Sequence, residues 1–272
     1  MAAINDIKKE LINILQESTA AEVEALPVFV ETYKTDARSG VQALVTKAKK
    51  AIDALEKEQQ RIENMKVYEK KYASYQYICG IDEAGRGPLA GPVVAGAVIL
   101  PKDCRILYLN DSKQLSAKKR EELYDMIMHE AVAVGVGIAE HKRIDEINIL
   151  QATYEAMREA VSKLSVKPNI LLNDAVTIPQ IDMPQVPIVK GDAISISIAA
   201  ASIIAKVTRD RIMVEYDKQY PQYHFAENKG YGAQVHIAAL KQYGATPIHR
   251  KTFIGNFVDV SENNGLICNS SM

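Results

Sequence analysis

Four acidic residues stand where apolar, strand-like runs end, and their side chains are the ones best suited to chemistry. Asp82 and Glu83 follow "YICGI", Asp174 ends "NILLND", and Asp192 ends "VPIVKGD". Functional side chains gather at strand ends of α/β sheets, because a rigid scaffold presents them at a shared edge. A structural role stays open for two of them. Asp174 could begin a turn, and Asp192 could cap a following helix, where Asp is favoured.

Carboxylates held within a few ångströms of one another repel, and their pKa values rise unless cations neutralise the charge. Oxygen ligands of this kind suit Mg²⁺ or Mn²⁺. Because four negative charges balance two divalent ions, the four acids predict a site for two metal ions. No Ser-His-Asp or Cys-His arrangement is apparent in the chain.

The two adjacent acids open a constrained loop, "GIDEAGRGPLAGP" at residues 80–92, in which three glycines and two prolines follow them. The simplest structural interpretation is a strand that ends in a polar turn. A nucleotide-binding phosphate loop is disfavoured, because no Lys-Ser/Thr pair follows the glycines.

Composition sets the class of protein. The chain has 272 residues with 47% hydrophobic content, enough for one sizeable core and an accessory region. No apolar run is long enough to span a membrane, and the N-terminus lacks the pattern of a signal peptide. Three cysteines at unrelated spacings are typical of reduced thiols, so we expect a cytoplasmic protein.

Charge alone does not identify a partner, since the net charge is −1. Residues 205–251 carry eight Lys/Arg against four Asp/Glu, an excess that permits a phosphate-binding face. An excess of this size is also typical of ordinary solvated helix faces.

The chain divides into three predicted parts. Residues 1–72 read as a helical extension, because apolar residues from Val41 to Leu55 recur at helical spacing. Twelve Lys/Arg balance twelve Asp/Glu there, so the extension is not a basic DNA-binding arm. Residues 73–256 form the predicted catalytic domain with a C-terminal helical substrate-binding part, and 257–272 form a tail.

Within the catalytic domain the pattern predicts a mixed α/β sheet covered by helices. The runs "QYICGID", "PVVAGAVIL" and "EAVAVGVGIAE" read as an antiparallel three-strand meander with short links. A helix over about residues 145–164 follows, then strands in "NILLNDA" and "QVPIVKGD". The apolar stretch "ISIAAASIIAKVTRDRIMVEYDKQY" predicts a long helix, and residues 234–243 a last one.

Several longer motifs carry a resemblance to bacterial ribonuclease HII, over about residues 73–255. They are "GIDEAGRGPLAGPVVAGAVIL", "DSKQLSAKKREELY", "LLNDA", "KGDAISISIAAASIIAKVTRD", "KGYGAQVHIAALKQYG" and "TPIHRKTF", in matching order and spacing. The helical N-terminal segment resembles an extension carried by some members. The resemblance says nothing of its role.

The resemblance implies an RNase H-like fold with parallel strands beside the meander. It implies an endonuclease that cuts the RNA strand of RNA–DNA hybrids, and that cuts 5′ of single ribonucleotides in duplex DNA. Two Mn²⁺ or Mg²⁺ ions would activate a water and stabilise the departing 3′-oxygen, leaving a 5′-phosphate and a 3′-hydroxyl. The expected partners are RNA–DNA hybrid and ribonucleotide-containing duplex DNA, with no membrane, for a protein expected to be a monomer.

The resemblance also assigns residues. The family's catalytic and metal-binding acids fall on Asp82, Glu83, Asp174 and Asp192, and its substrate-binding motif falls on Gly85, Arg86 and Gly87. Without side chains, the two glycines would let the backbone reach a ribose 2′-hydroxyl in the minor groove. The family's junction-sensing tyrosine falls on Tyr231, which could equally be a half-buried structural tyrosine.

Further substrate contacts are expected by analogy. The phosphate-contact candidates are Ser112, Lys113, Lys190, Lys206 and Arg209, and each could also be an ordinary surface residue. We assign His249 and Arg250 to structure. Two residues depart from the family pattern: Ile194 replaces a Lys or Arg beside a metal acid, and Ala233 replaces a Thr.

Two rival functions remain. A ribonuclease HIII-like nuclease would carry a β-containing N-terminal domain, whereas residues 1–72 read as helical. A non-catalytic hybrid-binding protein would be expected to have lost one or more acids, and all four are present.

Overall fold

The computed structural model describes residues 2–15 and 19–259 of the chain. It divides the chain into two compact units, Met1–Met65 and Lys66–Met272. Each unit has its own buried side chains and is described by itself. Most of the tail predicted at residues 257–272 lies outside the described residues.

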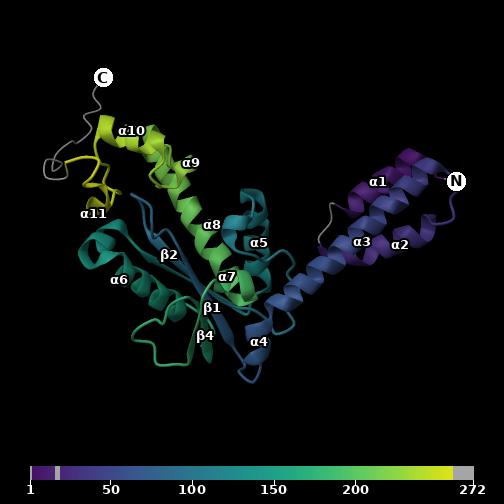
Figure 1. The fold of residues 1–272 in the computed structure, drawn as a ribbon, viewed down its shortest axis with the longest axis horizontal. Helices are drawn as coiled ribbons and strands as arrows, with labels where there is room; N and C mark the ends of the chain where they lie inside the picture. The colour runs from purple at the N-terminus through teal and green to yellow at the C-terminus, as the bar shows by residue number, and fades with distance from the viewer. Residues whose placement is uncertain (1, 16–18, 260–272) are drawn as a thin grey trace. The chain divides into compact units, whose positions relative to one another are not determined.

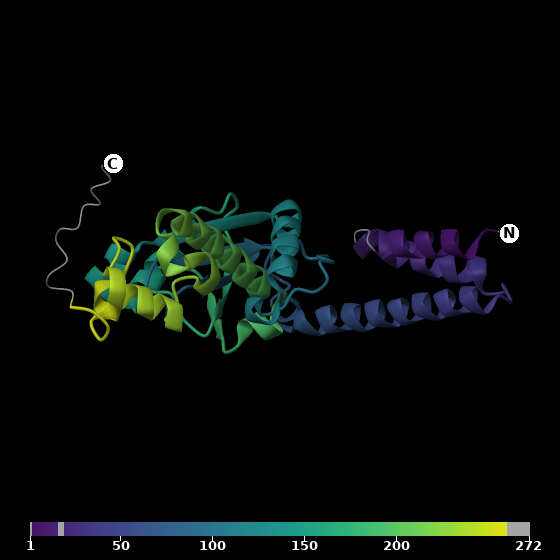
Figure 2. The ribbon, with the colours of Figure 1, turned by 90° about the horizontal axis from the view of Figure 1, so that it is seen from above.

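The first unit is helical, as the sequence predicts. It contains α1 (Ile4–Ile14), α2 (Thr19–Tyr33) and the long α3 (Ser39–Met65). Figure 2 shows α1 and α2 in purple running alongside the blue α3. The core of this unit comes from one apolar stripe on each helix. Its buried members include Ile7, Leu11, Leu26, Phe29, Val41, Val45 and Ala48.

The second unit is built on a five-stranded mixed sheet with the strand order β3-β2-β1-β4-β5. The strands are β1 (Ile78–Ala84), β2 (Val93–Ile99), β3 (Ala133–Ala139), β4 (Ile170–Asp174) and β5 (Gln185–Ile188). Strands β1, β2 and β3 pair antiparallel, while β4 pairs parallel with β1, and β5 with β4. This confirms the predicted meander with parallel strands beside it.

Two long helices cover opposite faces of the sheet (Figure 1), namely α6 (His141–Ser162) and α8 (Ile196–Gln219). Glycines in the strands allow the close approach. A Cβ on Gly137 of β3 would lie 1.9 Å from the Ala156 carbonyl oxygen of α6. A Cβ on Gly96 of β2 would lie 2.4 Å from the Ala201 carbonyl oxygen of α8. The missing side chains therefore set how closely each helix packs on the sheet.

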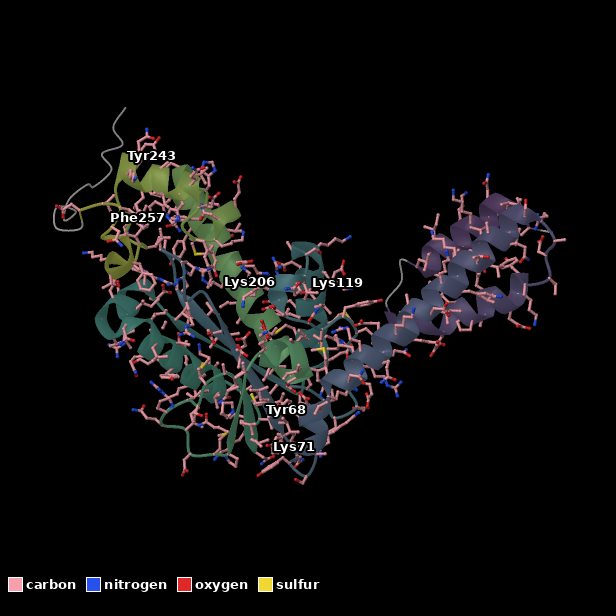
Figure 3. The ribbon with its side chains drawn as sticks, viewed as in Figure 1. Tyr68, Lys71, Lys119, Lys206, Tyr243 and Phe257 are labelled. Atoms are coloured by element: carbon pink, nitrogen blue, oxygen red, sulfur yellow. The ribbon has the colours of Figure 1, made fainter. Side chains whose placement is uncertain are left out.

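The predicted short link between the second and third strands is wrong. Residues 100–132 contain the 3₁₀ turn η1 (Ser112–Gln114) and helix α5 (Ala117–Glu130), which packs on α8. Figure 3 labels Lys119 on α5 and Lys206 on α8. The helix escaped prediction because only Leu123 and Ile127 are buried in a stretch otherwise rich in charge. Its periodic signal is correspondingly weak.

The remaining helices of the described chain are short, apart from α10. They are α4 (Val67–Lys71), α7 (Gly191–Ile194), η2 (Pro221–Tyr223), α9 (Phe225–Asn228), α10 (Gln234–Tyr243) and α11 (Lys251–Ile254). The bounds of α10 are those predicted. A second hydrophobic cluster, which includes Tyr223, Phe225 and Leu240, holds the C-terminal helices together. In the part of the chain that the structure describes, no helix could cross a membrane.

Removing residues 1–65 should leave the second unit folded, because the two units bury separate sets of apolar side chains. The check is far-UV circular dichroism with a single cooperative thermal transition. A longer deletion, of residues 1–72, also removes Tyr68 and Tyr72, which pack on the β1–β4 core near Ile170. This deletion should melt about 2–4 °C lower than the shorter one, the shift expected for about 1 kcal/mol in a domain of this size. Insolubility or loss of structure in the shorter deletion would contradict the division.

Candidate active site

Three neighbouring strands send acidic residues to one edge of the sheet. Strands β1 and β4 are parallel with Ile81 opposite Asn173, so Asp82 and Asp174, the next residues, end on the same side. Strand β5 runs parallel to β4, and Asp192 follows it in α7. The sequence predicted the acids from the ends of apolar runs, and the parallel register is what brings those ends together.

The acids are close enough to perturb one another. Burial, followed by the charges of Glu83 and Asp174, raises the pKa of Asp82 well above its ordinary value. Burial also raises the pKa of Glu83, against the opposing effect of Arg86. The pKa of Asp192 rises to about 6, through burial and then the charges of Asp111 and Asp174. The edge therefore holds carboxylates whose raised pKa values Arg86 and Lys113 offset only in part.

Carboxylate oxygens are the donors that Mg²⁺ and Mn²⁺ take, and the raised pKa values show that added positive charge would be favourable here. Among the described residues, no three His, Cys, Asp or Glu side chains already surround a common point as ligands do. The fit to metal thus rests on the donor type and on the mutual repulsion of the acids.

Two residues beside the acids were missed by the sequence analysis. The Ser202 hydroxyl of α8 lies 3.0 Å from the Ser112 hydroxyl, and its hydrogen bond to Asp82 partly offsets the raised pKa of that carboxyl. Asp111 lies next to Asp192 and contributes to its raised pKa. Asp111 adjoins the predicted Ser112 in "NDSK", but Ser202 sits in an apolar helical run and gave no signal.

The lysines predicted to touch phosphate differ in their surroundings. Burial acts to lower the pKa of Lys113, but Asp111, Asp82 and Asp192 raise it, so its exposed ammonium lies beside the acids. Lys190 is exposed in a left-handed turn with φ 57°. Lys206 is half-buried and paired with Asp210, with Nζ 2.7 Å from Oδ1. Ser112 is only 4% exposed, so its hydroxyl faces the protein.

The loop that follows the acids is held from inside by Arg250. This side chain is fully buried, and its guanidinium donates to four backbone carbonyls. The nitrogen–oxygen distances are 2.6 Å to Gly85, 2.8 Å to Arg86, 3.0 Å to Gly91 and 3.2 Å to Pro92. Because a trans peptide points its N–H away from its C=O, the inward carbonyls of Gly85 and Arg86 turn the N–H groups of Arg86 and Gly87 outward. The structural role predicted for Arg250 is thus a specific one.

Arg209 lies in the same interior rather than at the surface. It is fully buried and donates to the carbonyls of Pro92, Ala90 and Lys229 at 2.9, 3.2 and 2.9 Å. Its guanidinium carbon lies 5.8 Å from the Tyr231 ring centroid. A buried guanidinium whose donors meet carbonyls cannot reach a phosphate, which corrects the predicted phosphate contact.

The two glycines of the loop do different things. Gly85 is buried with φ 95°, and a Cβ there would lie 2.0 Å from Nε of Arg209. Gly87 is exposed, and its nearest neighbour would be Cε1 of Tyr231 at 3.8 Å. Gly85 is therefore required for internal packing, and the contact of its backbone with a ribose stays a prediction. Only Gly87 leaves open space beside a half-exposed tyrosine, 45% exposed.

A chain of buried hydrogen bonds holds the backbone at Tyr231. Nδ1 of His236 lies 2.8 Å from the Tyr231 carbonyl oxygen, so it must donate. Nε2 of the neutral His236 ring then carries no hydrogen and can accept. His249 then donates through Nε2, 2.9 Å away, and its Nδ1 accepts from the Thr246 backbone N–H. Both histidines are neutral in this arrangement. Burial lowers both pKa values, that of His249 to about 3.

Comparison with known proteins places these features in a family. The family model described as Ribonuclease HII matches residues 79–256, and the model described as Ribonuclease HII N-terminal domain matches residues 3–73. A Ribonuclease HII from Lachnoclostridium phytofermentans is 65% identical over 226 residues, covering 83% of this chain and 89% of that relative. A Ribonuclease HII from Clostridioides difficile is 51% identical over 252 residues, covering 92% of this chain and 96% of the relative.

Solved structures agree with the sequence relatives. The ribonuclease H2 of Pyrococcus horikoshii OT3 superposes with a TM-score of 0.56 at 30% identity, covering 65% of this chain and 93% of that one. The structure of a PCNA:RNase HII complex from Archaeoglobus fulgidus gives a TM-score of 0.56 at 28% identity, covering 64% of this chain and 94% of that one. The predicted RNase H-like fold is thereby confirmed.

Lowering the pH should destabilise the fold through the buried pair His236 and His249. In the unfolded state these rings take up protons below their ordinary pKa of about 6.5, whereas in the native state they stay neutral. The free energy of unfolding therefore falls as the pH drops below that value. Each proton taken up only on unfolding costs roughly 1.4 kcal/mol per pH unit. We expect His249→Asn to reduce this slope between pH 6.5 and 5 in urea unfolding. The exposed His129→Asn serves as control, and an unchanged slope in the first variant would contradict the neutral pair.

Proposed function

This chain belongs to the ribonuclease HII family, nucleases that hydrolyse RNA in RNA–DNA hybrids, and we propose that it also cuts 5′ of single ribonucleotides embedded in duplex DNA. The observation that carries the proposal is the acidic edge of the sheet, with raised pKa values, directly followed in the chain by the Gly87 loop. Two of the four acids and Gly87 thus lie on one short stretch. The products would be a 5′-phosphate and a 3′-hydroxyl.

Ribonucleases H depend on divalent metal ions, and Asp82, Glu83, Asp174 and Asp192 would hold two of them. Bound ions of this kind lower the pKa of the attacking water and stabilise the leaving oxygen. The protein's own part is to orient the carboxylates. The Gly191 N–H donates to Oδ1 of Asp174 at 2.8 Å, and the Glu83 N–H donates to Oδ1 of Asp82 at 2.7 Å.

The exposed cations near the acids supply contacts to the nucleic-acid backbone. The Lys113 ammonium lies beside the carboxylates, where a scissile phosphate would be brought. The Arg86 guanidinium is 3.3 Å from Oε1 of Glu83 and remains about half exposed, so it can turn to a neighbouring phosphate. Contacts of this kind position the strand without reading its sequence.

Recognition of the ribonucleotide follows from the outward face of the loop. With the carbonyls of Gly85 and Arg86 bound to Arg250, a backbone N–H on the outer side can meet a ribose 2′-hydroxyl. Tyr231 stands next to Gly87 with an exposed ring, which suits stacking on the deoxyribose past the RNA–DNA junction. The helical first unit and its family-model match favour this function over a ribonuclease HIII-like one.

The direct test is a DNA duplex that carries one ribonucleotide, incubated with the full chain and Mn²⁺ or Mg²⁺. We expect a cut on the 5′ side of the ribonucleotide, and none in excess EDTA. Asp82→Asn should abolish cleavage but retain hybrid binding, because the acid holds ions and not the nucleic acid. Cleavage in EDTA, or near-normal cleavage by Asp82→Asn, would remove the metal assignment. Binding without any cleavage by the wild type would favour a hybrid-binding protein.

The loop makes a separate prediction. Gly87→Ala should leave the thermal midpoint nearly unchanged, because the added methyl has room in the free protein. It should lower kcat/KM on hybrid about ten- to a hundredfold, since displacing one hydrogen-bonded group costs about 1–3 kcal/mol. Gly255→Ala is the matched control, as its added methyl meets nothing within 4 Å and that of Gly87 makes only an ordinary contact with Tyr231 at 3.8 Å. Equal activities of the two variants would place the recognition elsewhere.

A further inference from the structure

The short helix α4 sends a carboxylate to the start of α8. Oε1 of Glu69 accepts a hydrogen bond from the Ser195 hydroxyl at 2.6 Å and another from the Ser197 backbone N–H at 3.1 Å. Ser195 is fully buried and Ser197 is 2% exposed. Oε2 of Glu69 is also buried, without a hydrogen-bond partner among the described residues. This contact joins residues 126 positions apart in the chain.

A carboxylate is suited to this place. The first N–H groups of a helix have no partner within the helix, and the helix dipole favours negative charge there. Ser195 is itself the N-cap, since its hydroxyl oxygen accepts from the Ile198 N–H at 3.3 Å. Glu69 therefore completes a cap that α8 makes only in part, and it supplies the charge that serine lacks.

The cap continues by hydrogen bonds into the acidic edge. The Ser195 N–H donates to the Gly191 carbonyl at 2.8 Å, and the Gly191 N–H donates to Oδ1 of Asp174 at 2.8 Å. Asp192 lies inside the turn between these two bonds. A shift of Ser195 would therefore move the backbone that carries Asp192 and release the bond that orients Asp174.

We propose that Glu69 is a positioning residue for the metal-binding acids, acting through Ser195 and the turn at residues 190–195. The inference rests on the proposed function, because it assumes that Asp174 and Asp192 hold divalent ions. Glu69 hydrogen-bonds Ser195 and Ser197 and is not proposed as a ligand of the ions. It lies within residues 3–73, so the last helix of the segment matched by the N-terminal family model serves the acidic edge. This role is separate from whatever α1 to α3 do.

The test is calorimetric titration of Mn²⁺ into the full-length protein without nucleic acid. Glu69→Ala should weaken Mn²⁺ binding by about ten- to a hundredfold, the loss typical when a group that orients a ligand is removed. Glu69→Gln keeps an oxygen that can accept from both serines and should recover most of the affinity. An affinity for Glu69→Ala within about twofold of wild type would overturn the proposal. If the wild type itself bound no Mn²⁺, the proposed function would fail first.

Thermal melts separate positioning from simple stability. Bound metal raises the midpoint by an amount that depends on its affinity, so Glu69→Ala should show a smaller rise on adding Mn²⁺ than wild type. Ser116→Ala is the matched control, because it removes the N-cap bond of α5, from the Lys119 N–H to Oγ of Ser116 at 3.2 Å, and this bond involves none of the acids. It should lower the midpoint but keep the full Mn²⁺-induced rise. An unreduced rise in Glu69→Ala would assign Glu69 to stability alone and overturn the proposal.

Should Glu69→Ala fail to fold, Ser195→Ala provides a second route, because it removes the hydroxyl that donates to Glu69. It should weaken Mn²⁺ binding in the same direction. An affinity for Ser195→Ala within about twofold of wild type would contradict the path through this contact.

Discussion

Mutual repulsion among carboxylates at one sheet edge is the constraint around which the second unit is organised. The parallel register of β1 and β4 brings Asp82 and Asp174 to the same end, and burial, followed by the charges of Glu83 and Asp174, raises the pKa of Asp82. The surrounding protein donates single hydrogen bonds to these carboxylates, from the Gly191 N–H to Asp174 and from the Glu83 N–H and Ser202 to Asp82. These bonds orient the oxygens but do not neutralise the charge. Under the proposed function, divalent cations would supply the charge that these bonds do not.

Buried positive charge holds the loop that follows the acids, from Gly85 to Pro92. Arg209 and Arg250 are buried next to one another without a carboxylate in hydrogen-bond contact, and burial lowers the pKa of Arg250 to about 9. Their partners are backbone carbonyls between Gly85 and Pro92. Because Arg209 and Arg250 bind these carbonyls inside the protein, N–H groups of the loop can face its outer side. Under the proposed function, specificity for a 2′-hydroxyl would depend on these two buried arginines through the loop that they hold.

Much of this could be predicted from the sequence, for a local reason. The acids, the meander and the long helix are each visible as strand ends or apolar periodicity within a few residues. What escaped depends on contacts between distant segments. Nothing local distinguishes Arg209, which is buried, from Lys113, which is exposed. Likewise Ser202, and Glu69 with its partner 126 residues away, show their roles only once α8 is docked on the sheet.

That docking depends on one missing side chain. A Cβ on Gly80 of β1 would lie 2.1 Å from the Ser197 carbonyl carbon and oxygen, so only glycine lets the start of α8 touch the strand. Gly80 precedes Asp82 by two residues, and Ser197 is the residue whose N–H binds Glu69. The same backbone contact therefore fixes the distance from α8 to the first acid and the place where the cap is completed. A larger residue at position 80 would separate the helix that carries Ser202 from the strand that carries Asp82. The geometry of the acidic edge therefore depends on how closely α8 packs on the sheet.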